Sequence, residues 1–297
     1  MSKDLKIVLY ILGEKGYSVL NAINQVYSSE IFETVIYAED KNIQDDFSSQ
    51  IIKYCELYGI KYANKISCAL VSSESYKFAI GWRWIINDIK NLIILHDSIL
   101  PRYRGFAPLV SALINGDTKI GVSAIYASSE FDRGDILLQK TTEISYPIKI
   151  NCAIKKMAEL YVDCVLSIIK SIQNNQLRPI PQNDLLATYS LWRTDKDYYI
   201  NWKLPANKIK RFIDAVGHPY AGAKAFIEND SAIIFDAEVV DDNVFIEDRE
   251  LHIGKVVFVL DEYPVVICGE GLLKISSMQN MLGNNLLPLK KFRTLFY

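Results

Sequence analysis

Histidine and acidic side chains in the first half of the chain are the residues best suited to chemistry. The chain has three histidines, and an imidazole can accept or give a proton near neutral pH. His96 directly follows the apolar run at residues 92–95 and precedes a loop that contains proline, arginine and glycine. For His218 and His252, packing or solvation is the better interpretation. The position of His96 fits catalysis and a packed structural role equally.

A second polar cluster, with the sequence Glu130-Phe-Asp-Arg-Gly-Asp135, follows another apolar run. Such an acidic turn is most often only a solvated cap. Alone, this turn says little, and it carries weight only when it is considered together with the segment that contains His96.

The elements that must position these residues alternate between short apolar runs and amphipathic stretches, which predicts a parallel α/β sheet. We expect strands at residues 6–12, 35–38, 68–71, 78–80, 92–95 and 120–126, and helices at 17–28, 45–58, 107–115 and 151–174, with a turn at 13–16. Ligands in such sheets bind at the carboxyl ends of the strands. Residues 13–16, 81–84 and 96–105 are therefore the candidate binding loops.

The pattern changes after residue 175. A connector rich in Pro and Asn spans residues 176–190, and a β-rich domain is predicted for 191–297. That domain has one helical segment at 205–215, and strands are expected at 232–235, 254–260, 265–268 and 271–275, which suggests a small barrel or sandwich.

Composition excludes several classes of protein. Lys and Arg number 33 against 35 Asp and Glu, so the formal net charge of −2 offers no overall attraction to nucleic acid. Five cysteines show no metal-ligand or disulfide spacing, and reduced thiols with no metal site are expected. Without a signal peptide or membrane-spanning run, the sequence predicts a cytoplasmic protein with no membrane partner.

Taken together, several segments carry a family resemblance: His96-Asp-Ser-Ile-Leu-Pro-Arg-Tyr-Arg-Gly105, Asn115-Gly-Asp-Thr118, Gly121-Val122 and Asp132-Arg-Gly-Asp-Ile136. They resemble the folate-dependent formyltransferases, a superfamily that includes methionyl-tRNA formyltransferase, glycinamide ribonucleotide transformylase and the sugar N-formyltransferases. The His-x-Ser loop, the Asp-x-Gly-Asp turn and the spacing, with Asp132 36 residues after His96, all match. Segments at 193–202, 205–213 and 218–222 are similar to the start of the C-terminal domain of methionyl-tRNA formyltransferase.

The resemblance implies a Rossmann-like, mostly parallel sheet with flanking helices in residues 1–175, followed by a small β-barrel-like (OB-like) domain. It also implies formyl transfer from 10-formyltetrahydrofolate to an amine by a trio of Asn, His and Asp. His96 and Asp132 fall on two of these positions, and Asp132 would orient His96. Ile94 stands where the family has Asn, and it cannot donate a hydrogen bond to a developing oxyanion. One replacement for the missing hydrogen-bond donor is protonated His96 together with a backbone amide. The alternative is a non-catalytic homologue that binds folate or a nucleotide.

The resemblance also assigns binding residues. The folate would contact two loops, through Gly81, Trp82, Arg83, Trp84, Glu130 and Phe131. The acceptor would contact the N-terminal loop and the loop after His96, through Gly13, Tyr17, Ser98, Arg102, Tyr103 and Arg104. For Trp82 and Trp84, the alternatives are packing in the core or stacking beside a diphosphate. Arg102 and Arg104 either bind phosphate or brace their loop.

Local charge discriminates between acceptors. Residues 188–297 hold 13 Lys and Arg against 15 Asp and Glu, and residues 36–62 hold three lysines against five acidic residues. Neither segment is suited to a polyanionic tRNA. The sequence therefore predicts a nucleotide-linked amino sugar for surface polysaccharide or glycan synthesis, such as lipopolysaccharide or capsule, with no nucleic-acid partner and a possible homodimer. Methionyl-tRNA formyltransferase is the alternative.

Overall fold

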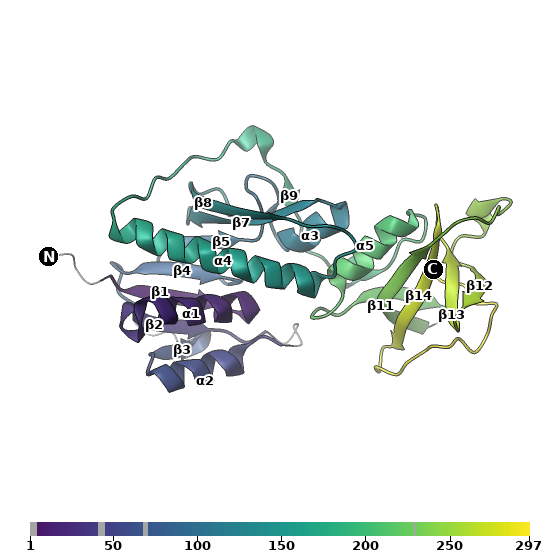
Figure 1. The fold of residues 1–297 in the computed structure, drawn as a ribbon, viewed down its shortest axis with the longest axis horizontal. Coiled ribbons are helices and arrows are strands. Elements are labelled where there is room, and N and C mark those ends of the chain that lie inside the picture. The colour runs from purple at the N-terminus through teal and green to yellow at the C-terminus, as the bar shows by residue number, and fades with distance from the viewer. Residues whose placement is uncertain (1–4, 41–44, 68–70, 229) are drawn as a thin grey trace. The chain divides into compact units, whose positions relative to one another are not determined.

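The computed structural model describes residues 5–40, 45–67, 71–228 and 230–297. The chain divides into two compact units, which are described separately (Figure 1). Unit 1 comprises residues 1–109, 118–144 and 152–191, and unit 2 comprises residues 110–117, 145–151 and 192–297.

A mixed seven-stranded sheet forms the centre of unit 1. Its strands, in spatial order, are β3 (Tyr62–Asn64), β2 (Phe32–Tyr37), β1 (Ile7–Ile11), β4 (Tyr76–Ile80), β5 (Leu92–His96), β7 (Lys119–Tyr126) and β8 (Ile136–Glu143). The first five are parallel, and β7 and β8 run antiparallel to their neighbours. All five residues of β1 are buried, as expected for a strand covered on both faces. The predicted mostly parallel sheet is confirmed.

The helices of unit 1 are α1 (Gly13–Tyr27), α2 (Ser48–Tyr58) and most of α4 (Ile150–Gln173), with short 3₁₀ turns η1 (Ser29–Ile31), η2 (Lys65–Ser67) and η3 (Asp184–Leu186). Most of α3 (Pro108–Asn115) belongs to unit 2. Figure 1 shows α1 and α4 in front of the strands, and the Lys15 ammonium of α1 lies 5.2 Å from the ring centre of Tyr161 in α4. These two helices therefore meet at the edge of the sheet where β1 and β5 end.

Two expectations for the elements of unit 1 need correction, and one lies outside the described residues. The predicted turn at residues 13–16 is wrong, because these residues form the first turn of α1. A Cβ on Gly16 would lie 2.7 Å from the Cβ of Ile11, so this glycine allows α1 to approach β1 rather than breaking the helix. Strand β8 was not predicted. Of the strand expected at 68–71, residues 68–70 lie outside the part of the chain that the structure describes.

The connector at residues 176–190 belongs to unit 1. Ile180 forms a two-way backbone bridge with Ile136, at the start of β8. Further along, β9 (Tyr189–Ser190) pairs in parallel with β6 (Arg104–Gly105), which follows the His96 loop. The connector is thus hydrogen-bonded to both loops that carry the predicted catalytic residues.

Unit 2 contains a five-stranded antiparallel sheet, as predicted for the β-rich part of the chain. The strands, in spatial order, are β10 (Ala223–Ile227), β11 (Asp230–Val240), β14 (Leu272–Asn280), β13 (Tyr263–Ile267) and β12 (Val256–Leu260), with the turns η4 (Asp195–Tyr198) and η5 (Arg249–Leu251) outside the sheet. Helix α5 (Ala206–Val216) packs against β11 and buries Ile209 and Ile213.

The C-terminal residues connect the two edge strands of the unit 2 sheet. Leu295 bridges Lys255, just before β12, and Phe296 bridges Ile227 in β10. Phe296 is 1% exposed, and its ring lies 5.4 Å from that of Trp202. This closure makes the sheet barrel-like. In the described part of the chain, the helices are too short or too polar to span a lipid bilayer.

Candidate active site

His96 lies at the carboxyl end of β5 and is 7% exposed. Its Nε2 is 2.8 Å from the carbonyl oxygen of Tyr103. Because a carbonyl can only accept, Nε2 is the nitrogen that donates a proton there. Nδ1 lies 3.4 Å from Oδ1 of Asp132, within ion-pair distance but longer than an ordinary hydrogen bond. In the neutral imidazole, Nδ1 therefore keeps its lone pair and can accept a proton.

Asp132 comes from the turn between β7 and β8. Its backbone is in the left-handed region, with φ of 58°, which aspartate tolerates better than most residues. Oδ2 accepts a hydrogen bond of 2.7 Å from the backbone N–H of Gly105, which leaves Oδ1 facing His96. The loop after His96 thus fixes the carboxylate, and the structure brings the two predicted catalytic residues together.

The turn that carries Asp132 lies very close to β7. A Cβ on Gly134 would lie 1.7 Å from the carbonyl oxygen of Tyr126. Gly134 does not have a positive φ, so its backbone conformation does not call for glycine. Glycine is required here because no space is left for a side chain.

A partly buried polar group that the sequence did not reveal lies beside His96. The Asp97 carboxylate is paired with the Lys15 ammonium and accepts a 2.5 Å hydrogen bond from the Tyr161 hydroxyl. Burial alone would raise the pKa of Asp97, but the charge and hydrogen bonds of Lys15 and Tyr161 outweigh it and lower this pKa below the ordinary value. Burial and the Asp97 charge raise the pKa of Tyr161 well above its usual value. This group ties the start of α1 and the middle of α4 to the end of β5.

Ile94, at the position of the family's asparagine, lies in an apolar cluster. It packs against buried residues that include Tyr10 and Leu92, and Trp82 packs on the same cluster. Asn91 does not replace the missing amide, because it precedes β5 at the opposite end of the strand and its side chain donates to the carbonyl of Glu74.

The loop after His96 holds four residues assigned to the acceptor. Ser98 is 4% exposed and its hydroxyl donates to the carbonyl of Arg102 at 2.7 Å. The Arg102 guanidinium lies 5.1 Å from the Tyr103 ring centre. Arg104 is 1% exposed, and its guanidinium pairs with Asp184 at 2.7 Å. These contacts favour the interpretation in which Arg104 braces the loop.

The two loops assigned to folate differ in exposure. Gly81, after β4, has φ of 63°, and a Cβ there would lie 2.7 Å from the carbonyl oxygen of Leu12. Trp82 contacts Trp84 edge-to-face, at 5.1 Å between ring centres, and Arg83 pairs with the buried carboxylate of Asp40.

In the second of these loops the side chains lie outward. Phe131 is 82% exposed. Glu130 pairs with Arg133 at 2.9 Å. The two loops follow β4 and β7.

The N-terminal residues assigned to the acceptor lie in α1. Gly13, with φ of 73°, donates its N–H to the carbonyl of Asp46. The Tyr17 ring lies 5.9 Å from both Phe47 and Tyr54. Since Lys15 between them pairs with Asp97, this end of α1 lies next to the residue that follows His96.

Gln182 also escaped prediction from the sequence, because it lies in the connector. Its side-chain amide contacts Asp132, Gly134 and Arg104. Gln182 directly follows Pro181 and lies just before η3. This position in the connector was the only local signal that could have pointed to it.

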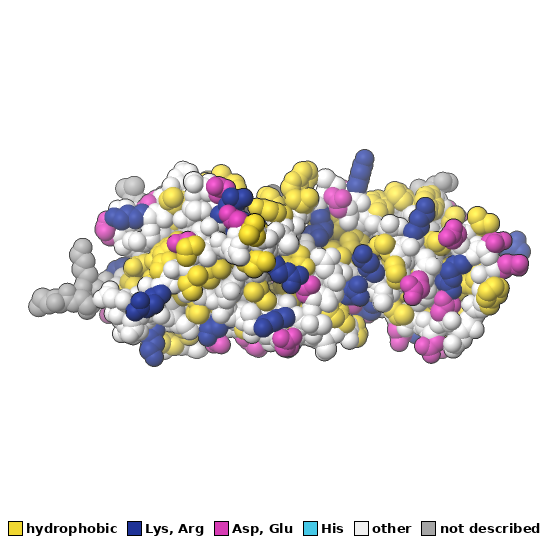
Figure 2. Space-filling view, turned by 90° about the horizontal axis from the view of Figure 1, so that it is seen from above, with side chains coloured by type: hydrophobic (Ala, Val, Ile, Leu, Met, Phe, Trp, Pro, Cys, Tyr) yellow, Lys and Arg dark blue, Asp and Glu magenta, His cyan; other side chains and the backbone are white. Residues whose placement is uncertain are grey.

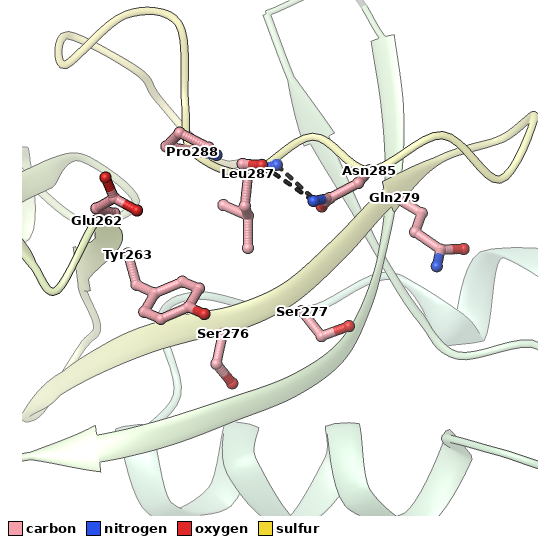
Figure 3. Close-up of a pocket in the computed structure, with 8 residues that line it drawn as sticks. All are labelled: Glu262, Tyr263, Ser276, Ser277, Gln279, Asn285, Leu287 and Pro288. Atoms are coloured by element: carbon pink, nitrogen blue, oxygen red, sulfur yellow. Dashed lines mark hydrogen bonds between the residues drawn. The ribbon is translucent and has the colours of Figure 1, made fainter.

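A polar hollow in unit 2 contains none of the predicted site residues (Figure 3). It has a volume of about 340 Å³ and is lined by Glu262, Tyr263, Ser276, Ser277, Gln279, Asn285, Leu287 and Pro288. Within residues 5–40, 45–67, 71–228 and 230–297, no group of three His, Cys, Asp or Glu side chains is placed to hold a metal ion.

Comparison with known families agrees with this geometry. A family model described as formyl transferase matches residues 78–159, and one described as formyl transferase, C-terminal domain, matches residues 193–292. The first match contains His96 and Asp132, and the second covers most of unit 2. The chain belongs to the formyltransferase superfamily.

Among curated relatives, the chain is similar to the methionyl-tRNA formyltransferase of Caldanaerobacter subterraneus, with 32% identity over 187 residues. This alignment covers 63% of the chain and 58% of the relative. A second methionyl-tRNA formyltransferase, from Fusobacterium nucleatum, is also 32% identical and is covered to 59%. The chain therefore matches about three fifths of the length of these relatives.

Solved structures share the fold across most of the chain. The N-formyltransferase of Helicobacter canadensis, solved with folinic acid and dTDP-3-aminofucose, has a TM-score of 0.70 at 17% identity, with 92% of this chain and 99% of that one covered. The sugar 3N-formyl transferase WlaRD, solved with dTDP and 5-N-formyl-THF, has a TM-score of 0.66 at 20% identity, covering 94% and 99%.

Proposed function

We propose that the protein is an N-formyltransferase that moves a formyl group from 10-formyltetrahydrofolate to the amine of a nucleotide-linked amino sugar. The observation that carries this proposal is the arrangement of His96. Its Nε2 proton is engaged by Tyr103, so its Nδ1 faces Asp132 with a lone pair available. General-base chemistry on an amine needs such a free lone pair, and a nearby carboxylate stabilises the imidazolium that forms.

The residues around His96 perform the transfer as follows. The folate supplies the formyl group. His96 Nδ1 takes the proton that the amine loses as the new C–N bond forms, and Asp132 stabilises the resulting imidazolium. The same proton is then available for the nitrogen that leaves with the broken C–N bond. Ile94 donates nothing, so a backbone N–H or the imidazolium itself supplies the oxyanion contact.

The loops assigned to folate fit such a group. Trp82 Nε1 is buried and has no hydrogen-bond partner among the described residues, which leaves one donor in the loop after β4 for a bound pterin. In the second loop, Phe131 exposes an aromatic surface on which a planar ring can pack. Gly81, Arg83, Trp84 and Glu130 complete the proposed folate contacts, largely through backbone, since Arg83 is already paired.

Charge supports a small acceptor over tRNA. On the face shown in Figure 2, the described Lys and Arg side chains are interspersed with Asp and Glu. The same balance holds in residues 188–297, where 13 Lys and Arg stand against 15 Asp and Glu, so this part of the chain offers no excess of positive charge to RNA. A sugar nucleotide used for a surface polysaccharide or glycan is the acceptor that these observations favour, bound near Gly13, Tyr17, Ser98, Arg102 and Tyr103.

Methionyl-tRNA formylation is the second candidate, and the names of the curated relatives favour it. The test is to incubate the protein with 10-formyltetrahydrofolate and a panel of TDP-, UDP- and GDP-linked amino sugars, or with methionyl-tRNA. We expect one amino sugar to gain the mass of one formyl group. Transfer to methionyl-tRNA alone would establish the second candidate, and folate binding without transfer to any acceptor would indicate a non-catalytic homologue.

A further inference from the structure

One glutamine outside the family's catalytic trio connects both sides of the catalytic pair. Gln182 lies in the connector, 50 residues after Asp132 in sequence. Its Nε2 donates two hydrogen bonds of 2.8 Å, one to the carbonyl oxygen of Asp132 and one to that of Gly134. Both protons of the amide are therefore used to hold the turn that carries the catalytic carboxylate.

The oxygen of the same amide holds the opposite loop. Gln182 Oε1 accepts from Arg104 Nε at 3.1 Å and from a terminal nitrogen of Arg104 at 2.8 Å. Arg104 directly precedes Gly105, whose N–H donates to the carboxylate of Asp132. One side chain thus fixes Asp132 twice, through its own carbonyl and through the loop that binds its carboxylate.

Asp132 needs such support for a physical reason. Its backbone is left-handed, with φ of 58°, a conformation that glycine adopts most readily and that aspartate adopts only occasionally. The distance of 3.4 Å between Asp132 Oδ1 and His96 Nδ1 also leaves little room for drift. Displacing a reacting group by about 1 Å can cost on the order of 100-fold in rate.

We propose that Gln182 is a positioning residue that sets the distance and angle between Asp132 and His96. This inference rests on the proposed function, because it assigns Gln182 to the same transfer step. Arg104 and Asp184 extend the contact, since the Arg104 guanidinium also pairs with Asp184, and Arg104 lowers the pKa of that exposed carboxyl.

The decisive variant is Gln182→Glu. It keeps an oxygen for Arg104 but replaces the donor that faces two carbonyl oxygens with an acceptor, so the turn loses both hydrogen bonds. We expect kcat to fall about 10–100-fold while KM for both substrates changes less than about threefold. Asn183→Ala, at the neighbouring position, removes a contact only within the connector and serves as the matched control, with kcat unchanged.

A readout independent of turnover separates this inference from the proposed function. Ring-proton NMR signals of His96, assigned with His96→Gln, should move in Gln182→Glu at fixed pH, whereas those of His218 and His252 should stay in place. If wild-type protein transfers no formyl group, the proposed function fails, and the movement of the His96 signals still decides the positioning role. Unchanged His96 signals in a folded Gln182→Glu protein, with or without unchanged kcat, would overturn the inference.

Discussion

At the scale of single residues, the site depends on which nitrogen of His96 is free. The carbonyl of Tyr103 engages Nε2, so the protein determines the tautomer with a backbone group rather than with a side chain. Asp132 then acts on Nδ1 at 3.4 Å. The orientation of this imidazole is therefore built into the loop that follows β5.

Loss of either member of the pair should abolish turnover. We expect His96→Asn and Asp132→Asn each to lower kcat by at least about 100-fold, because general acid–base groups typically contribute 10²–10⁴-fold. Steady-state formyl transfer measures this, with circular dichroism and thermal unfolding to show that both variants fold. Full activity in either variant would remove it from the proposed mechanism.

Asp97 should make stability depend on pH. Its pKa is lowered in the folded state, so the unfolded chain binds its proton more readily. The contribution of Asp97 to the free energy of unfolding is thus complete above the unfolded pKa, near 3.9, and is lost as pH falls further toward the folded value. Urea unfolding between about pH 6 and pH 3 measures it.

Asp97→Asn should remove this dependence, so that its difference in stability from wild type narrows as pH falls. Exposed Asp163→Asn, on the same helix as Tyr161, is the control and should keep the wild-type slope. A constant difference between Asp97→Asn and wild type across this range would contradict the role given to Lys15 and Tyr161.

At the scale of elements, the turn that carries Asp132 is positioned by close backbone approach. The turn between β7 and β8 can lie against Tyr126 only because residue 134 lacks a Cβ. The geometry of Asp132 therefore depends on a residue that does no chemistry.

Gly134→Ala should show this dependence. Its Cβ would meet the carbonyl oxygen of Tyr126, so the turn must move, and we expect a loss of about 1–3 kcal/mol of stability and on the order of 100-fold in kcat. Arg133→Ala, an exposed change in the same turn, should retain most activity. Thermal unfolding and formyl transfer measure the two effects, and wild-type kcat in Gly134→Ala would show that the turn tolerates displacement.

The elements that sequence patterns predict well are those whose signal is local. The buried apolar runs of β1, β4 and β5 indicate parallel strands, and α4 shows helical periodicity over its whole length. Strand β8 escaped because its residues are half-exposed, with no buried run and no regular alternation. The glycines at 13 and 16 predicted a turn, whereas Gly13 is needed for its positive φ at the start of α1 and Gly16 for close packing against Ile11.

The residues of the site also divide into those that local sequence patterns predict and those that they do not. The pairing of His96 with Asp132 follows from motifs shared with a family, and each motif is continuous in sequence. Lys15 and Tyr161 join Asp97 across 82 and 64 residues of chain, and Gln182 joins Asp132 across 50. Contacts between such distant residues leave no periodicity, so only the folded chain reveals them.

At the scale of the whole molecule, mixed surface charge predicts weak interaction with RNA. Each phosphate that a protein neutralises adds about one unit to the negative slope of log affinity against log salt. With unit 2 carrying no excess of positive charge, we expect binding to methionyl-tRNA to be too weak to detect at physiological salt, with little gain as salt is lowered.

A filter-binding titration at several salt concentrations measures this, with a methionyl-tRNA formyltransferase as the positive control. Tight binding with a steep salt slope would reverse our choice of acceptor, because it would reveal a basic surface that charge counting misses.

The hydrogen bonds of the connector also decide where such a protein can be divided. A chain ended at residue 175 would retain the strands and helices of unit 1 but would lose Ile180, Gln182 and β9, which hold the two catalytic loops. A cut before residue 191 therefore removes the backbone and side-chain contacts of the loops that carry His96 and Asp132. When two relatives exchange C-terminal segments, by recombination or by design, we expect that the connector must be inherited together with the loops that carry His96 and Asp132, because it is hydrogen-bonded to both.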